Sequence, residues 1–223
     1  LTLGVSDQNI IDAYEDPLYY IIKESELPID IDPMKSDLSD SLERQTIAKV
    51  LSRGLNKPVG YVLPLNFGTT RWITSSWVLR RGYLYLSAGN SPLGLRLPLG
   101  SLVEKPHSEL ALPFEPDLFA HYPALGEYSV LAHERCKKAD ATLSNTQTQT
   151  FVRTALCAEV REGKLFIFLP PLNHTEALLD LVACIEAVAE SLHVKVFLEG
   201  YEPSHDLRLE RIKVTPDPGV IEV

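Results

Sequence analysis

The sequence predicts an α+β protein in which a mixed, mainly antiparallel sheet packs on helices. Three observations support this fold class: helical spacing of apolar residues in two N-terminal stretches, short aromatic and branched segments punctuated by Gly and Pro between residues 59 and 103, and a β-β-α-β-β-β order after residue 151. With 223 residues, of which 45% are hydrophobic, the chain can bury a sizeable core.

The first predicted helix begins at Pro17. Asp16 is a suitable N-cap, and proline is favoured at the first helical position because its missing N–H is not needed there. Apolar residues follow at helical spacing, and Pro28 ends the helix.

A second helix is predicted from about residue 40 to 53. Asp40 is its N-cap, Glu43 stands three positions later as in a capping box, and Gly54 provides the C-terminal stop. Apolar residues recur on one face at Leu42, Ile47, Val50 and Leu51.

The stretch from 59 to 103 predicts strands and hairpins. The segments are "VGYVLPL", "RWITSSWVLRRG", "YLYLSAG" and "LGLRLPLGS". Between 104 and 150 the periodicity is lost, and we expect a linker or a partly disordered excursion. The chain is thereby divided into a helical and hairpin-rich part (1–103), this linker, and a C-terminal unit (151–223).

The C-terminal unit begins with an alternating pattern. Even positions from Val152 to Val160 form a core face, and the odd positions carry small residues together with Arg153 and Glu159. The turn "REGK" predicts an antiparallel hairpin between strands 151–160 and 164–169.

A helix is predicted next, followed by three strands. The helix covers about 175–192 with Thr175 as its cap and an apolar stripe on one side. The strands are predicted at 194–200, 207–214 and 219–223.

Charge and cysteine content exclude several classes. A formal charge of −9 with scattered Lys and Arg gives no basic field for nucleic acid. The longest apolar stretches are interrupted by acids and fall short of the roughly 20 residues of a membrane span. Three cysteines without CxxC spacing indicate reduced thiols, and we expect a soluble, cytoplasmic protein.

Carboxylates near the ends of two separate strands suggest a site. Glu159 and Glu222 each lie near a strand end, and Asp217 lies in the turn before the second strand. We expect both strands in one antiparallel sheet, with both carboxylates on the face opposite the helix 175–192. Carboxylates gathered on one face repel one another unless a hard cation such as Mg²⁺ neutralises them. The alternative is that exposed edge strands carry Glu for solubility.

Long segments of the chain resemble the bacterial amidoligase family, whose landmark domain is of unknown function and several of whose members have a transglutaminase-like region. The resemblance covers nearly all of the chain except 104–150. It rests on "AYEDPLYYIIKESELPIDIDP", "GLNKPVGYVLPL", "LRRGYLYLSAGNSPLGLRLPLGSL", "VRTALCAEVREGKLFIFLPPL" and "LEGYEPSHDLRLERIKVTPDPGVIEV".

That family is similar to the glutamine synthetase and glutamate–cysteine ligase superfamily of carboxylate–amine ligases. The resemblance implies a partial catalytic sheet, with Glu159 and Glu222 as metal ligands and Asp217 as a ligand or orienting group. It also implies ATP and Mg²⁺ as cofactors and amide-bond formation on a peptide or amino-acid carboxylate through an acyl phosphate. Cys157 stands where a second acid is expected, and "DPG" replaces "DG".

Cationic side chains near these acids are candidates for catalysis and for phosphate or substrate contacts. Arg153 shares the face of Glu159, and Arg211 shares a face with Lys213 leading toward Asp217. A solvated strand face is the alternative reading for Arg211 and Lys213.

His205, followed by Asp206, is a further catalytic candidate. A loop histidine beside an acid also occurs as a surface or turn-stabilising pair.

The rival function is a non-catalytic substrate-binding module that serves a transglutaminase-like partner domain. Because the chain begins at Leu1 and ends just after Glu222, we expect an excerpt of a longer ligase that is inactive by itself.

Overall fold

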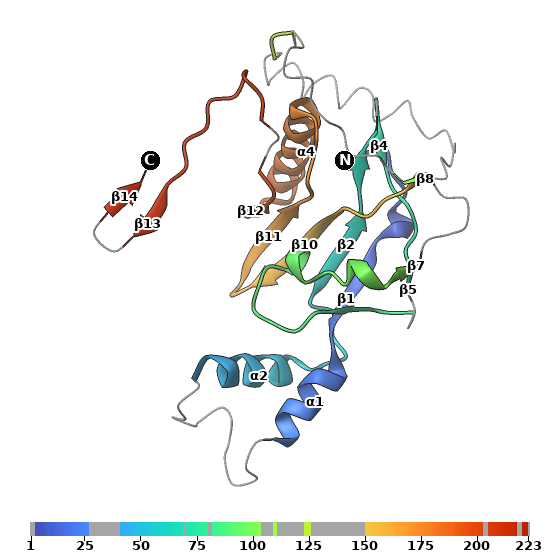
Figure 1. Cartoon of the computed structure of the whole chain (residues 1–223), viewed down its shortest axis with the longest axis vertical. Helices are drawn as coiled ribbons and strands as arrows, with labels where there is room; N and C mark the ends of the chain where they lie inside the picture. The colour runs from blue at the N-terminus through green and yellow to red at the C-terminus, as the bar shows by residue number, and fades with distance from the viewer. Residues whose placement is uncertain are drawn as a thin grey trace.

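A computed structural model describes residues 3–26, 41–68, 70–79, 82–103, 109–110, 123–125, 150–202, 205–217 and 220–222. Its centre is a six-stranded mixed sheet of order β12-β11-β10-β2-β1-β6 (Figure 1). The strands are β1 (Ile11–Glu15), β2 (Gly60–Pro64), β6 (Leu84–Leu86), β10 (Ala155–Arg161), β11 (Lys164–Leu169) and β12 (Val196–Gly200). Three of the five neighbouring pairs are antiparallel, and β1–β6 and β11–β12 are parallel, which confirms the α+β prediction.

Within the described residues, the other elements are three α-helices, short 3-10 turns and two-stranded pairings. The helices are α1 (Pro17–Ser25), α2 (Ser41–Arg53) and α4 (Thr175–Leu192), and the 3-10 turns are η1 (Asp7–Asn9), η2 (Leu93–Arg96) and η3 (Leu99–Ser101). The pairings are β3 (Asn66–Phe67) with β4 (Trp72–Ile73), β5 (Val78–Leu79) with β7 (Leu102–Val103), β8 (Glu109–Leu110) with β9 (Thr150–Phe151), and β13 (Thr215–Asp217) with β14 (Val220–Glu222).

The N-terminal helices agree with the sequence prediction where they are described. The Asp16 side chain caps α1 by accepting from the Leu18 N–H at 3.1 Å, with Pro17 at the first position. Gly54 ends α2 in the left-handed region at φ 91°, which favours glycine because it has no Cβ. Pro28 and Asp40 lie outside the described residues.

The first half of the chain differs from the sequence prediction in two places. Strand β1 was not predicted, because Glu15 interrupts its apolar alternation and yet is only 3% exposed. The segment "LGLRLPLGS" is not a strand but contains η2 and η3. Pro92 and Pro98 precede these turns and lack the N–H that a strand ladder requires.

The β10–β11 hairpin is confirmed. Arg161 pairs with Lys164, and the two residues between them, Glu162 and Gly163, have φ values of 51° and 74°. A two-residue loop with two positive φ values matches the twist of the flanking strands.

Helix α4 spans the predicted residues, but its cap differs. His174 is the N-cap, and Thr175 is the first helical residue, its hydroxyl donating to Asp206. The strand predicted at 207–214 is wrong: this segment is irregular, and Leu207 is 88% exposed.

The two parts of the chain on either side of 104–150 share one sheet. Strands β1, β2 and β6 come from the first part, and β10, β11 and β12 come from the last. Most of 104–150, including the stretch expected to be a linker, lies outside the described residues.

Each face of the sheet carries a buried core, so the central strands bury residues on both faces, whereas the outer strand β12 remains exposed. Helix α4 packs on one face, called the α4 face, through Leu169, Leu172, Ala177 and Leu181. The other face, called the η2 face, lies under the segment that carries η2 and η3, which crosses in front of β10 and β2 in Figure 1. Its core includes Ala13, Val62, Leu93, Cys157 and Phe168. In the described part of the chain, no helix is both long and apolar enough to cross a membrane.

Candidate functional site

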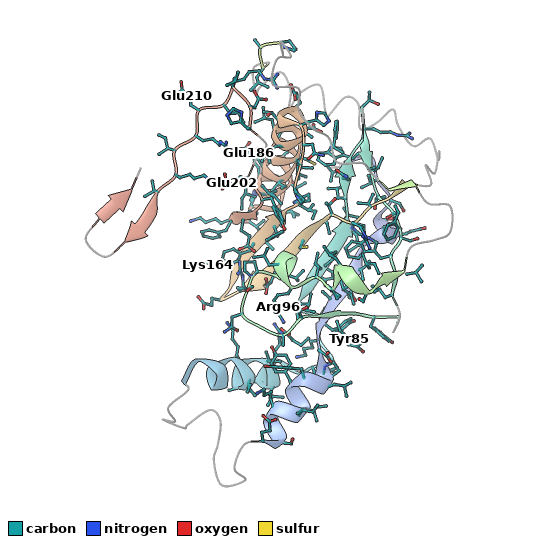
Figure 2. All side chains as sticks on the ribbon, viewed as in Figure 1. Tyr85, Arg96, Lys164, Glu186, Glu202 and Glu210 are labelled. Atoms are coloured by element: carbon teal, nitrogen blue, oxygen red, sulfur yellow. The ribbon has the colours of Figure 1, made fainter. Side chains whose placement is uncertain are left out.

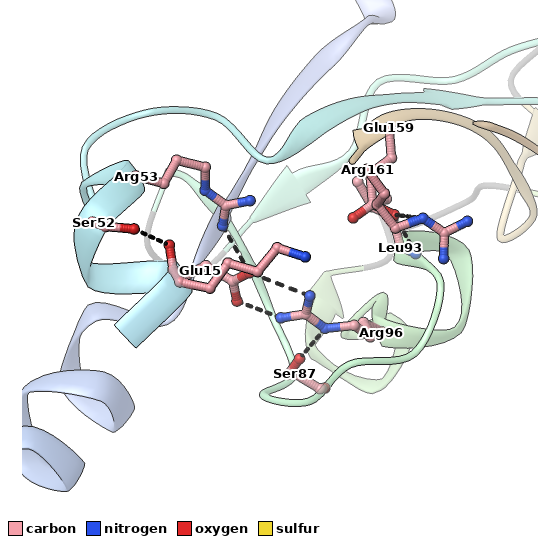
Figure 3. A network of polar contacts seen from close by, with 9 residues as sticks. Glu15, Ser52, Arg53, Ser87, Leu93, Arg96, Glu159 and Arg161 are labelled. Atoms are coloured by element: carbon pink, nitrogen blue, oxygen red, sulfur yellow. Dashed lines mark hydrogen bonds and ion pairs between the residues drawn. The ribbon is translucent and has the colours of Figure 1, made fainter. Parts of the chain in front are cut away.

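Six charged side chains gather on the η2 face toward one end of the sheet. We call them the acid–guanidinium cluster, and Figure 3 shows five of its members with their hydrogen bonds and ion pairs. The cluster consists of Glu15, Arg53, Arg96, Glu159, Arg161 and Glu199.

The strand register places the acids of β1 and β10 on one face. Odd-numbered residues of both strands point to the η2 face, and Gly60 of β2 stands between Ala13 and Glu159. A Cβ at Gly60 would overlap the Ala158 carbonyl and lie 2.7 Å from Leu93 Cδ1. Glycine at this position therefore lets η2 approach the sheet beside Glu159.

Turn η2 contacts the sheet with its backbone. The Leu93 N–H donates to Glu159 Oε2 at 3.2 Å, and a Cβ at Gly94 would overlap the ring of Phe168. The turn thus provides a backbone donor for a carboxylate that is only 7% exposed.

Glu15 and Arg96 form a buried ion pair that ties η2 to the end of β1. Both Arg96 Nη atoms donate to Glu15, and Arg96 Nε donates to the Ser87 carbonyl at 2.7 Å. Arg53, at the end of α2, donates to Glu15 Oε1 at 3.0 Å. Glu15 therefore has two guanidinium partners, which a buried carboxylate needs to remain charged.

Glu159 has weaker ionic contacts than Glu15. Its nearest cation is Arg161, with Nε 3.6 Å from Oε2, while Arg161 Nη2 pairs with Glu199. Burial raises the pKa of Glu159, and the Leu93 N–H, Arg161 and Arg96 oppose that rise. A buried carboxyl with a perturbed pKa beside guanidinium groups is a common feature of functional sites.

Two guanidinium donors in the cluster lack an acceptor. Arg161 Nε and Arg53 Nε are buried atoms without a hydrogen-bond partner in the described structure. The guanidinium of Arg161 lies over the Phe166 ring, 3.9 Å from its centroid, which holds its plane in place. These donors fit an anionic oxygen, because an unsatisfied buried N–H is costly.

Cys157 lies on the η2 face but is a poor nucleophile. Its thiol is 1% exposed, and burial, with Glu159 and Glu199, raises its pKa to about 12. Since the thiolate is the reactive form, this cysteine stays protonated and inert at neutral pH.

The cluster does not by itself fit a metal ion. Three carboxylates are matched by three guanidiniums, so no excess negative charge is left for Mg²⁺. The residues that the structure describes include no group of three or more His, Cys, Asp and Glu side chains placed to hold a metal.

The structure does not place the three predicted metal ligands together. Glu159 belongs to the six-stranded sheet, whereas Asp217 and Glu222 belong to the separate β13–β14 pairing, which lies apart from the sheet in Figure 1. The expectation that Glu159 and Glu222 share one sheet is therefore wrong. The physical reason is that no strand forms at 207–214 to carry the chain back into the sheet. Glu159 does lie on the face opposite α4, as expected.

The predicted cationic candidates lie outside the cluster. Arg153 is exposed before β10, and His205 is exposed in the loop after β12. Arg211 and Lys213 lie on the same side of their segment, where both pair with Glu202. The distance is 3.1 Å from Arg211 Nη1 to Glu202 Oε2 and 2.7 Å from Lys213 Nζ to Glu202 Oε1. Figure 2 shows Glu202 well away from Arg96. The catalytic and binding roles of these residues remain predictions.

Asp206 holds a loop rather than orienting a histidine. It accepts hydrogen bonds from the Arg208 guanidinium and from Thr175 at the start of α4. Arg208 in turn pairs with Glu176 at 2.7 Å. These contacts fasten the loop to the N-terminal end of α4.

Sequence reasoning missed most of the cluster. A signal was present in Glu15, which shares its strand parity with Ile11 and Ala13, and in Arg96, which lies within the apolar run "LGLRLPL". A charged residue at a core position implies a buried partner. The partners lie far away in sequence, so the signal does not identify them.

Comparison with known proteins identifies the family of the chain. No curated protein and no solved structure matches it. A family model does match, and it covers residues 1–223. The chain belongs to the family described as "Putative amidoligase enzyme".

Proposed function

We propose that the chain forms part of an ATP- and Mg²⁺-dependent carboxylate–amine ligase whose site includes the acid–guanidinium cluster. Family membership supports a ligase-like function at a coarse level. The observation that carries the finer proposal is the buried carboxylate of Glu159, which accepts from the Leu93 N–H and is ion-paired with Arg161, whose Nε has no hydrogen-bond acceptor.

The proposed reaction has two steps. An oxygen of a peptide or amino-acid carboxylate attacks the γ-phosphorus of ATP, so that ADP leaves and an acyl phosphate forms. An amine then attacks the acyl carbon, inorganic phosphate leaves, and the amine loses a proton. Both steps concern anionic oxygens, which guanidinium groups bind and orient.

The described residues supply parts of this chemistry. Arg161 and Arg53 each have an Nε donor without a hydrogen-bond acceptor, which we assign to an oxygen of the substrate carboxylate or of a phosphate. Phe166 keeps Arg161 oriented, and Glu15 keeps Arg53 and Arg96 in place. Because the cluster is balanced in charge, a role for Mg²⁺ requires further carboxylates. Asp217 and Glu222 belong to the separate β13–β14 pairing, so the described residues do not supply these carboxylates.

A substrate-binding module that does no chemistry is the second candidate. The pairing of each cluster carboxylate with a guanidinium favours it, because such a site holds its charges permanently. The module would bind a peptide or amino-acid carboxylate for a transglutaminase-like partner.

Trapping the intermediate separates the two candidates. The complete protein that contains this chain is incubated with ATP, Mg²⁺, a panel of amino acids and peptides, and hydroxylamine as the amine. A ligase converts the acyl phosphate into a hydroxamate, in amounts equal to the ADP released and only when a carboxylate substrate is present. Binding of a carboxylate without hydroxamate or ADP from any member of the panel would favour the binding module.

A further inference from the structure

Among the strands that the structure describes, β12 is an open edge of the central sheet. It stands at the end of the strand order and pairs on one side with β11. Every second N–H and C=O of a strand points away from its neighbour, so the outer side of β12 presents backbone donors and acceptors for another strand. Edge strands in soluble proteins are usually short, bulged or charged to prevent such pairing.

This edge exposes apolar side chains on both faces, although its η2 face also carries the charged Glu199. Phe197 is 43% exposed on the η2 face, and its neighbour Leu198 is 47% exposed on the α4 face. Exposed apolar side chains also lie just before the strand, at Leu192 and Val194, and just after it, at Tyr201.

The sequence of the edge is complementary to itself. In an antiparallel pairing of two copies centred on Phe197, Lys195 faces Glu199 of the second copy twice, Val196 faces Leu198 twice, and the two Phe197 rings face each other. Lys195 is exposed directly before the strand. Glu199 pairs with Arg161 through Oε2, and its second oxygen can accept from a lysine.

We propose that β12 pairs antiparallel with β12 of a second copy of this chain, which joins the two central sheets around a twofold axis at Phe197. The proposal rests on edge position, apolar exposure and charge complementarity, and it does not require the ligase chemistry, although Glu199 also belongs to the acid–guanidinium cluster. An interface of this kind is isologous, so one substitution changes it at two places.

Sedimentation of the full chain over a range of concentrations tests the pairing. The wild type should form a dimer. Lys195→Glu places like charges opposite each other at two positions and should weaken the dimer about tenfold or more. Phe197→Lys should give a monomer. Leu207→Lys is the matched control, because Leu207 is more exposed than Phe197 but lies off the strand.

A disulfide across the axis provides a second, independent readout. Directly opposed residues in antiparallel strands have Cα atoms about 4.5–5.5 Å apart, within the range that a disulfide spans. In a Cys136→Ser background, Phe197→Cys should form a covalent dimer on mild oxidation, and Leu207→Cys should not. Cys157 and Cys184 are buried and should not contribute.

Three outcomes would overturn the proposal. One is a wild-type chain that stays monomeric up to its solubility limit. Another is a dimer that Leu207→Lys weakens as much as Phe197→Lys does, which would indicate general hydrophobic association. The third is a dimer in which the Phe197→Cys variant forms a disulfide no faster than the Leu207→Cys variant, which would indicate that another surface makes the contact.

Discussion

Burial determines how each ionisable residue of the cluster behaves. Glu15 has two guanidinium partners, whereas Glu159 has a backbone N–H and one guanidinium at a longer distance. Glu159 is therefore the carboxylate whose charge the fold stabilises least, because burial raises its pKa against these partners. Glu159 is therefore the carboxylate of this face that is most available to bind a substrate or a cation.

Glu159→Gln should leave the fold intact and change the pH dependence of its stability. Glutamine keeps an oxygen for the Leu93 N–H but removes the charge that burial disfavours. A carboxyl whose pKa is raised on folding contributes stability below the pKa of the unfolded chain, about 4.3, and loses it as the pH rises through the folded value. Relative to the variant, the wild type should therefore lose stability as the pH rises from 4 to 8.

Urea unfolding at several pH values measures this difference. Glu210→Gln, at an exposed position, is the control and should follow the wild type at every pH. A Glu159→Gln variant that is less stable at pH 8 than at pH 4, relative to wild type, would show that the charge of Glu159 stabilises the fold.

Cys157 should resist thiol reagents in the folded chain. With a pKa of about 12, its thiolate is only about one part in 10⁴ at pH 8, and the side chain is buried. Iodoacetamide labelling followed by mass spectrometry should show modification of Cys157 only after unfolding in urea. Rapid labelling in the folded state would mean that the η2 face opens to solvent.

At the scale of elements, close contacts of turns and loops hold the site in shape. Turn η2 reaches the sheet only because Gly60 and Gly94 lack side chains. The loop after β12 reaches α4 through Asp206 and Arg208. Each of these contacts can be changed by one substitution that has a matched control.

Gly94→Ala should push η2 away from the sheet. The added methyl overlaps the Phe168 ring, which is itself packed in the core, so the variant should lose about 1–3 kcal/mol. Gly100→Ala is the control, because a Cβ there meets nothing within 4 Å. Chemical denaturation measures both. Equal stability of the two variants would contradict the close contact of η2 with Phe168.

Asp206→Asn should release the loop from α4. The Arg208 guanidinium holds the pKa of Asp206 well below its usual range, so the stabilisation is present above the unfolded pKa of about 3.9 and is lost as the pH falls below it. The variant should lose about 2 kcal/mol at pH 7, because the acid is largely buried, and less at pH 3.

Glu202→Gln is the control for the Asp206 measurement. It removes an exposed acid that also has two cationic partners, and it should not change stability measurably. A loss at Asp206→Asn that is the same at pH 3 and pH 7 would show that packing, rather than charge, fastens the loop.

At the scale of the whole molecule, the six strands of the central sheet come from segments spread between residues 11 and 200. The sequence predicted the β10–β11 hairpin, helix α4 and the mixed α+β class, because local alternation, a two-residue turn and helical periodicity specify them. It did not predict β1 or the order of the strands, because Glu15 conceals the alternation and strand order depends on contacts distant in sequence.

The candidate site was predictable only in part. Glu159 was identified because it shares a strand face with small residues and belongs to a family motif. Arg96 and Arg53 reach Glu15 from η2 and α2, across 81 and 38 residues of sequence, and no local pattern reports such pairs. The predicted partnership of Glu159 with Glu222 assumed that their strands share a sheet, and strand pairing between distant segments depends on contacts that the local sequence does not specify.

The most direct test of the account is the rate of ATP-dependent hydroxamate formation by Glu159→Gln in the complete protein, beside Glu210→Gln. We predict that Glu159→Gln lowers the rate at least about a hundredfold without loss of stability, because a charge aligned with the reacting groups contributes mainly in the transition state. Glu210→Gln should keep the wild-type rate. If Glu159→Gln also kept the wild-type rate, the acid–guanidinium cluster would not be the active site.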